Sequence, residues 1–144
     1  MIASIAKSFF MSFGIACLAQ LALASIQSTY VSDFLKSNIV NIQIGLLAIN
    51  VATLGIVLTK IRDLVDKGVS ADEFSRTREQ MLLSIKEQVG LIAAALIILS
   101  LADAKALPFV VAPVVLQTML LTCFVYSLMI LYDTAKSVFV LLDA

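Results

Sequence analysis

The positions of the charged residues constrain this chain more than any other feature of its sequence. Ten basic and ten acidic residues leave four long spans without a charge, Ser8–Ser32, Ser37–Thr59, Gln88–Ala102 and Ala106–Tyr132. A helix that crosses the hydrocarbon core of a membrane needs about 20 mostly apolar residues, and three of the spans reach that length. The span 88–102 would be only about 22 Å long as a helix, so Lys86 and Lys105 are expected at the two interfaces, with their ammonium groups in the headgroup layer.

This pattern predicts an all-α polytopic membrane protein. We expect a single domain over 1–144, a four-helix transmembrane bundle with spans at about 8–30, 38–60, 86–104 and 107–132. Hydrophobic residues make up 61% of the chain and charged residues 14%, which lies outside the range of soluble domains. A re-entrant third segment is the alternative to four full spans. The start of the chain resembles a signal peptide, but its apolar run is too long, so we interpret it as an uncleaved first helix.

The basic residues predict the orientation of the bundle. With four spans, the N-terminus, the segment 60–87 and the C-terminus share one side of the membrane, and that side carries eight of the ten basic residues. Only Lys36 and Lys105 fall on the other side, in short connections that also hold Asp33 and Asp103. The excess of basic residues on cytoplasmic loops therefore places both termini in the cytoplasm of a cell with an inner membrane.

The segment 60–87, which we call the hairpin, is expected to extend the second and third helices into the cytosol. Gly68 is suited to the left-handed conformation that ends many helices. Ser70 and Glu73 have the spacing of a capping box, in which each side chain accepts a hydrogen bond from the other residue's amide. The second helix should run over about 38–67 and the third over about 71–102.

Charges on the hairpin make it a candidate docking site for a cytosolic partner. Acidic and basic residues alternate along it, so a solvated tip whose charges pair with one another is the simpler interpretation. The docking interpretation rests on basic residues around one apolar anchor, namely Arg62, Lys67, Phe74, Arg76 and Arg78.

Two helices carry stripes of small and polar residues that suit close helix packing or oligomer contacts. The first helix has Ser8, Ser12, Ala16 and Gln20 at every fourth position. The second has a stripe with steps of three and four, formed by Asn41, Gly45, Ala48, Ala52 and Gly55. One stripe is expected to be left for a second copy, which predicts a homo-oligomer.

Strongly polar residues at membrane depth have two interpretations. Gln20, Asn50 and Gln117 could hydrogen-bond between helices, or they could line a pore through a bundle or oligomer. No acidic or basic residue falls at mid-bilayer, where ion-coupled carriers usually place one.

Composition argues against catalysis. The chain has no histidine and no nucleotide-binding loop, and its two cysteines lack metal-ligand spacing. We expect no catalytic, cofactor or metal residues and no cofactor. The formal net charge of zero also argues against direct nucleic-acid binding.

The predicted function is that of a small oligomeric inner-membrane anchor or sensor subunit. Its hairpin would recruit or regulate a cytosolic effector protein, while the lipid bilayer and further copies of the chain are its other partners. A pore-forming oligomer, either a channel or a holin-like protein, is the alternative. In size and layout the chain resembles the small four-span inner-membrane components of bacterial phage-defence and exclusion systems, which implies such a setting for either function.

Overall fold

The computed structural model describes residues 2–103 and 113–142, and the regular structure in this part of the chain is helical throughout. The elements are α1 (Ile2–Ser25), α2 (Tyr30–Asp66), the short 3₁₀ helix η1 (Ala71–Phe74), α3 (Ser75–Asp103) and α4 (Pro113–Leu142). Each of the four α-helices is long and apolar enough to cross a membrane. The prediction of an all-α chain with four such helices is confirmed.

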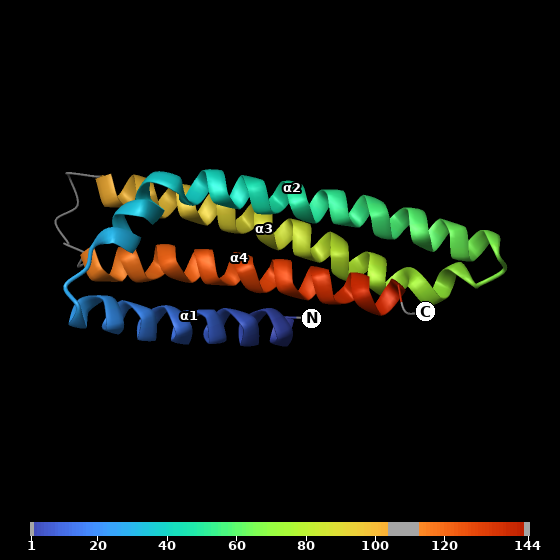
Figure 1. The fold of residues 1–144 in the computed structure, drawn as a ribbon, viewed down its shortest axis with the longest axis horizontal. Coiled ribbons are helices and arrows are strands. Elements are labelled where there is room, and N and C mark those ends of the chain that lie inside the picture. The colour runs from blue at the N-terminus through green and yellow to red at the C-terminus, as the bar shows by residue number, and fades with distance from the viewer. Residues whose placement is uncertain (1, 104–112, 143–144) are drawn as a thin grey trace.

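The helix α4 lies at the centre of the arrangement (Figure 1) and packs against all three other α-helices. The helices α2, α3 and α4 also pack against one another, so they form a three-helix core. Within the described residues, α1 packs against α4 alone. The bundle is therefore three central helices with one outer helix attached.

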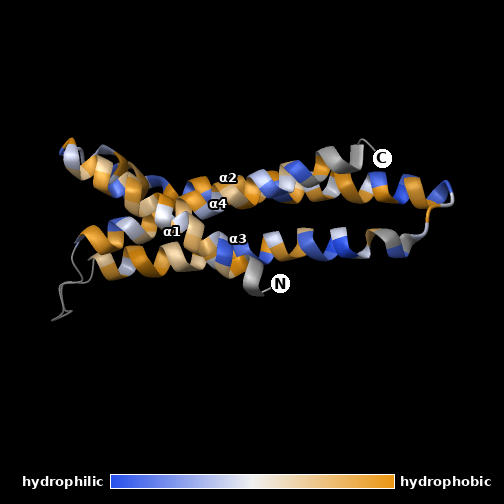
Figure 2. Cartoon of the chain, turned by 90° about the horizontal axis from the view of Figure 1, so that it is seen from below, coloured by the Kyte–Doolittle hydropathy of each residue, from blue (hydrophilic) through white to orange (hydrophobic). Residues whose placement is uncertain are grey.

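Burial on α2 follows the helical repeat, because one face of the helix meets α3 and α4. Its buried positions are three, four or seven residues apart: Ser32, Leu35, Ile39, Gln43, Leu46, Asn50, Val57 and Ile61. The outward faces of the bundle remain apolar, with Phe10 70% and Ile56 64% exposed. Hydrophilic residues gather toward the α2–α3 turn (Figure 2). An apolar exterior with a polar end suits a bundle surrounded by lipid.

The connection between α1 and α2 lies earlier in the chain than the charges suggested. We expected a loop around Asp33 and Lys36, but both residues belong to the first turns of α2, which begins at Tyr30. The reversal occurs at 26–29, where Gln27 adopts a positive φ of 51°. A carboxylate in the first turn of a helix interacts favourably with the free amides there, so Asp33 does not need to end the helix.

The turn between α2 and α3 is a Schellman motif. Gly68 has the expected left-handed conformation, with φ 98°. The Gly68 amide donates to the Val65 carbonyl at 2.9 Å and the Val69 amide donates to the Leu64 carbonyl at 3.1 Å. These two bonds satisfy carbonyls that the end of α2 would otherwise leave unpaired.

The predicted capping box is not formed by Ser70. Ser70 does occupy the N-cap position, but its side chain makes no capping hydrogen bond. The following turn is the 3₁₀ helix η1 and the α-helix starts only at Ser75. A 3₁₀ turn presents its first amides differently from an α-turn, which removes the geometry that a capping box requires. The side chain of Glu73 lies outside the described part of the structure.

The third and fourth helices are each unbroken over their described residues. The helix α3 runs without interruption from Ser75 to Asp103 and lies antiparallel to α2 (Figure 1), which contradicts the re-entrant alternative. The helix α4 continues past its last charges to Leu142. The predicted start of the fourth span, near residue 107, lies outside the described residues.

Candidate interaction site on the hairpin

The hairpin is held together by its own apolar cluster. Val57, Ile61 and Met81 are buried between α2 and α3. Partly buried residues pack around them, including Phe74 from η1 and Val138 from α4. This cluster fixes the two helices at the position where the predicted docking residues lie.

Two of the predicted docking residues, Arg62 and Arg78, line one groove on the hairpin. The groove measures about 410 Å³, and its other lining residues are the apolar Leu58, Ile61 and Val65. Arg62 and Arg78 come from different helices, α2 and α3, and both are exposed. The register of the hairpin thus places two guanidinium groups beside one apolar floor.

Four basic side chains of the hairpin have no acidic partner among the described residues. Among the described side chains, neither Arg62 nor Arg78 forms an ion pair or a hydrogen bond with a carboxylate. The same holds for Lys67 and Arg76. The interpretation of a self-paired tip therefore finds no support in the described part of the hairpin.

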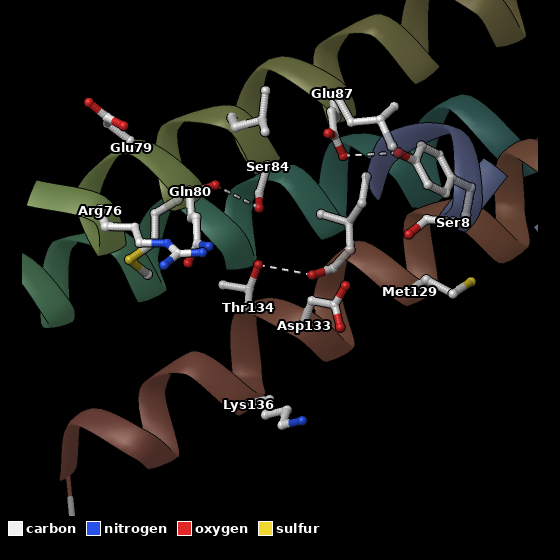
Figure 3. A pocket seen from close by; sticks show the side chains of 15 residues that line it. Ser8, Arg76, Glu79, Gln80, Ser84, Glu87, Met129, Asp133, Thr134 and Lys136 are labelled. Atoms are coloured by element: carbon white, nitrogen blue, oxygen red, sulfur yellow. Dashed lines mark hydrogen bonds between the residues drawn. The ribbon is translucent and has the colours of Figure 1, made fainter. Parts of the chain in front are cut away.

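A second hollow, of about 550 Å³, opens between α1, α3 and α4 beside the hairpin. Charged residues of both signs line it, among them Arg76, Glu87, Asp133 and Lys136. Figure 3 shows Arg76 extending toward the space between α3 and α4, whereas Glu79 and Lys136 point away from it. On the inner side, the Tyr126 hydroxyl donates a 3.0 Å hydrogen bond to Glu87 Oε2, drawn as a dashed line in Figure 3.

The five predicted docking residues do not share one surface. Arg62 and Arg78 lie at the groove, Arg76 lies at the larger hollow, and Lys67 caps the end of α2. Phe74 is partly buried against the hairpin cluster, so much of its ring packs inside the hairpin.

The polar residues that were predicted at membrane depth form hydrogen bonds between helices. Gln20 Nε2 donates to Gln117 Oε1 at 3.1 Å and joins α1 to α4. Asn50 Nδ2 donates to Gln88 Oε1 and joins α2 to α3. Each predicted pore residue thus has an interhelical partner within the chain.

The two small-residue stripes differ in burial. On α1, Ser12 and Ala16 are fully buried, where small side chains let α1 approach α4 closely. The α2 stripe is exposed at all five predicted positions, Asn41, Gly45, Ala48, Ala52 and Gly55. Apart from the adjacent residues and the local helix backbone, no described heavy atom lies within 4 Å of the position that a Cβ would take at Gly45 or Gly55.

Sequence reasoning did not single out Glu87, Tyr126 and Asp133 as neighbours. The hydrogen-bonded pair is separated by 39 positions in the chain. Its formation depends on the register between α3 and α4, and no local sequence pattern specifies that register. The only signal in the sequence was that Glu87 and Asp133 each stand at one end of a span without charge.

Comparison with known proteins identifies no relative. No protein-family model matches the chain, and neither a curated protein nor a solved structure matches it.

Proposed function

We propose that this protein is an oligomeric inner-membrane anchor or sensor subunit that recruits or regulates a cytosolic effector through its hairpin. Both termini and the hairpin face the cytoplasm in this proposal, because eight of the ten basic residues lie on that side. A bacterial phage-defence or exclusion system is the setting that the layout suggests.

The groove on the hairpin carries the proposal. Its two arginines have no carboxylate partner among the described residues, and its floor is apolar. Arginine binds carboxylates through two parallel hydrogen bonds, and an apolar floor on which Leu58 is 39% exposed favours an apolar side chain of the partner. The matching ligand is an amphipathic segment with acidic residues beside an apolar face.

Replacing both groove arginines tests this docking. In Arg62→Gln/Arg78→Gln, we expect the cytosolic effector that co-purifies with the intact protein to be lost, because its carboxylates lose their partners. Lys7→Gln/Lys86→Gln is the matched control, since it removes two exposed positive charges from the same end outside the groove. Direct binding of the purified effector to each variant, reconstituted in vesicles, measures the loss.

An effector that binds both double variants equally well would contradict docking at the groove. Loss of binding in both variants would assign the interaction to general positive charge instead.

The exposed α2 stripe supports the oligomeric part of the proposal. Small residues on a lipid-facing helix let a second helix approach closely. The exposed amide of Asn41 makes no hydrogen bond within the described chain, and a neighbouring subunit could supply one.

A pore formed by the same α2 stripes is the second candidate, favoured by the exposed Asn41 beside small residues. Such an oligomer would surround a narrow polar conduit. Ion flux through vesicles containing the purified oligomer separates the two functions, because the anchor requires no conductance. Flux that Asn41→Leu abolishes would favour the pore.

A further inference from the structure

Three amide side chains lie inside the core formed by α2, α3 and α4. Gln43 and Gln88 are fully buried, and Asn50 is 2% exposed. Gln43 and Asn50 are seven residues apart on the buried face of α2, whereas Gln88 comes from α3. Apolar residues of the same faces, Leu46 and Leu91, are also buried. The amides therefore have no bulk solvent to complete their hydrogen bonds.

The hydrogen bonds within the core leave three amide atoms unsatisfied. Asn50 Nδ2 donates to Gln88 Oε1, and Gln43 Nε2 donates to Ser127 Oγ at 3.4 Å. Gln43 Oε1, Asn50 Oδ1 and Gln88 Nε2 have no partner among the described residues. Exchanging oxygen and nitrogen in both Asn50 and Gln88 would again leave one acceptor and one donor unpaired. Since buried polar groups are nearly always paired in native proteins, these atoms indicate a bound species.

The kinds of unsatisfied atoms determine which small ligand fits. Asn50 Oδ1 and Gln43 Oε1 are acceptors, whereas Gln88 Nε2 is a donor. A cation at the Asn50–Gln88 pair would face the donor, and an anion would face the acceptors. A water molecule donates to the oxygen and accepts from the nitrogen at the same time. Buried waters typically make about three hydrogen bonds to such groups.

We infer that the amide cluster of Gln43, Asn50 and Gln88 is an internal water site in the core of the bundle. One water bridges Asn50 Oδ1 and Gln88 Nε2, which belong to side chains already joined by a hydrogen bond. Gln43 is two turns away along α2, about 10 Å, so its oxygen takes a second water. The bound water completes the polar contact between α2 and α3 without requiring a channel through the bundle.

Water-edited solid-state NMR on the full-length protein in lipid bilayers tests the inference. With the chain uniformly labelled with ¹⁵N and ¹³C, magnetisation should pass from water to the Gln88 side-chain amide several-fold faster than to the backbone amide of Ile39, which is fully buried in the same core. The Leu91 methyls, one turn along α3, should receive water magnetisation as well. Transfer from water to the Gln88 side-chain amide that is as slow as transfer to Ile39 would overturn the inference.

The variant Asn50→Leu/Gln88→Leu provides the matched control. It removes both bridging groups while keeping similar side-chain volumes, so the water signal at the Leu91 methyls should disappear. Transfer to Leu91 that persists in this variant would show that the water does not sit on the Asn50–Gln88 pair, and would also overturn the inference. Gln20 and Gln117 stay intact, and their amide signals report that the bundle remains folded.

Discussion

At the scale of single residues, pairs of amide side chains connect the helices of the bundle. The hydrophobic effect gives little reason for apolar helices to associate inside a bilayer, so packing and hydrogen bonds must supply the preference. The chain places such bonds between α1 and α4, through Gln20 and Gln117, and between α2 and α3, through Asn50 and Gln88. These residues act in pairs, and substitution of one member leaves the other without its partner, buried in the case of Asn50 and Gln88.

Substituting one amide of a pair should therefore lower the stability of the bundle more than substituting both. We predict that Asn50→Leu lowers the free energy of unfolding by about 1–2 kcal/mol, because Gln88 loses its partner in the core. Asn50→Leu/Gln88→Leu should be less destabilised than this single variant, since neither buried amide of this pair remains without its partner. Unfolding in mixed detergent micelles measures both. A double variant that loses the sum of the two single losses would contradict the pairing.

Residue positions could be predicted from the sequence only where a local rule applies. The left-handed Gly68 follows from its lack of a side chain and is confirmed. The hydrogen bond from Tyr126 to Glu87 and the gathering of Arg62 with Arg78 depend on the register between helices. Register is decided by packing along whole faces, and no single position reveals it.

At the scale of elements, the helices differ in how many neighbours they pack against. The helix α4 is covered by three neighbours, whereas α1 packs on α4 alone within the described residues. The sequence has a small-residue stripe on both α1 and α2, but it does not indicate which stripe packs against another helix of the chain. The stripe on α1 is used for the contact with α4, and the stripe on α2 is left exposed.

The exposed stripe on α2 leads to a prediction for assembly. Gly45→Ile/Gly55→Ile should abolish dimers or larger oligomers detected by cross-linking in bilayers, because the added side chains keep a second helix at a distance. The fold should be retained, since both sites have open space within the chain. Gly14→Ile on α1, which is equally open, is the control and should leave assembly unchanged. Cross-linking unaffected by the α2 substitutions would exclude α2 as the oligomer surface.

Charge alone misplaced one helix boundary. Asp33 and Lys36 interrupt the hydrophobic pattern, so they were expected in a loop, but a charge at a helix end can remain helical. The reversal at 26–29 contains no charged residue, and its only local signals are the short polar side chains Ser28 and Thr29. Spans without charge therefore locate long apolar helices better than they locate the helix ends.

At the scale of the whole molecule, the arrangement gives the protein two different ends. One end holds the short connection between α1 and α2, and the other holds the hairpin with both hollows and with arginines that have no carboxylate partner among the described residues. The four apolar helices between them were predictable, because long spans without charge have few alternatives. The shape of the groove and the central position of α4 were not predictable, since both depend on which faces pack.

The central claim is that the bundle spans the membrane with its hairpin in the cytoplasm, and cysteine accessibility tests it most directly. In a background of Cys17→Ala and Cys123→Ala, Ser70→Cys places one thiol on the hairpin and Thr29→Cys places one on the α1–α2 connection, both at exposed positions. The account predicts that a membrane-impermeant maleimide, given access to the outer face of the inner membrane, labels Thr29→Cys at once and Ser70→Cys only after the membrane is permeabilised. Immediate labelling of Ser70→Cys in the intact membrane would contradict the account.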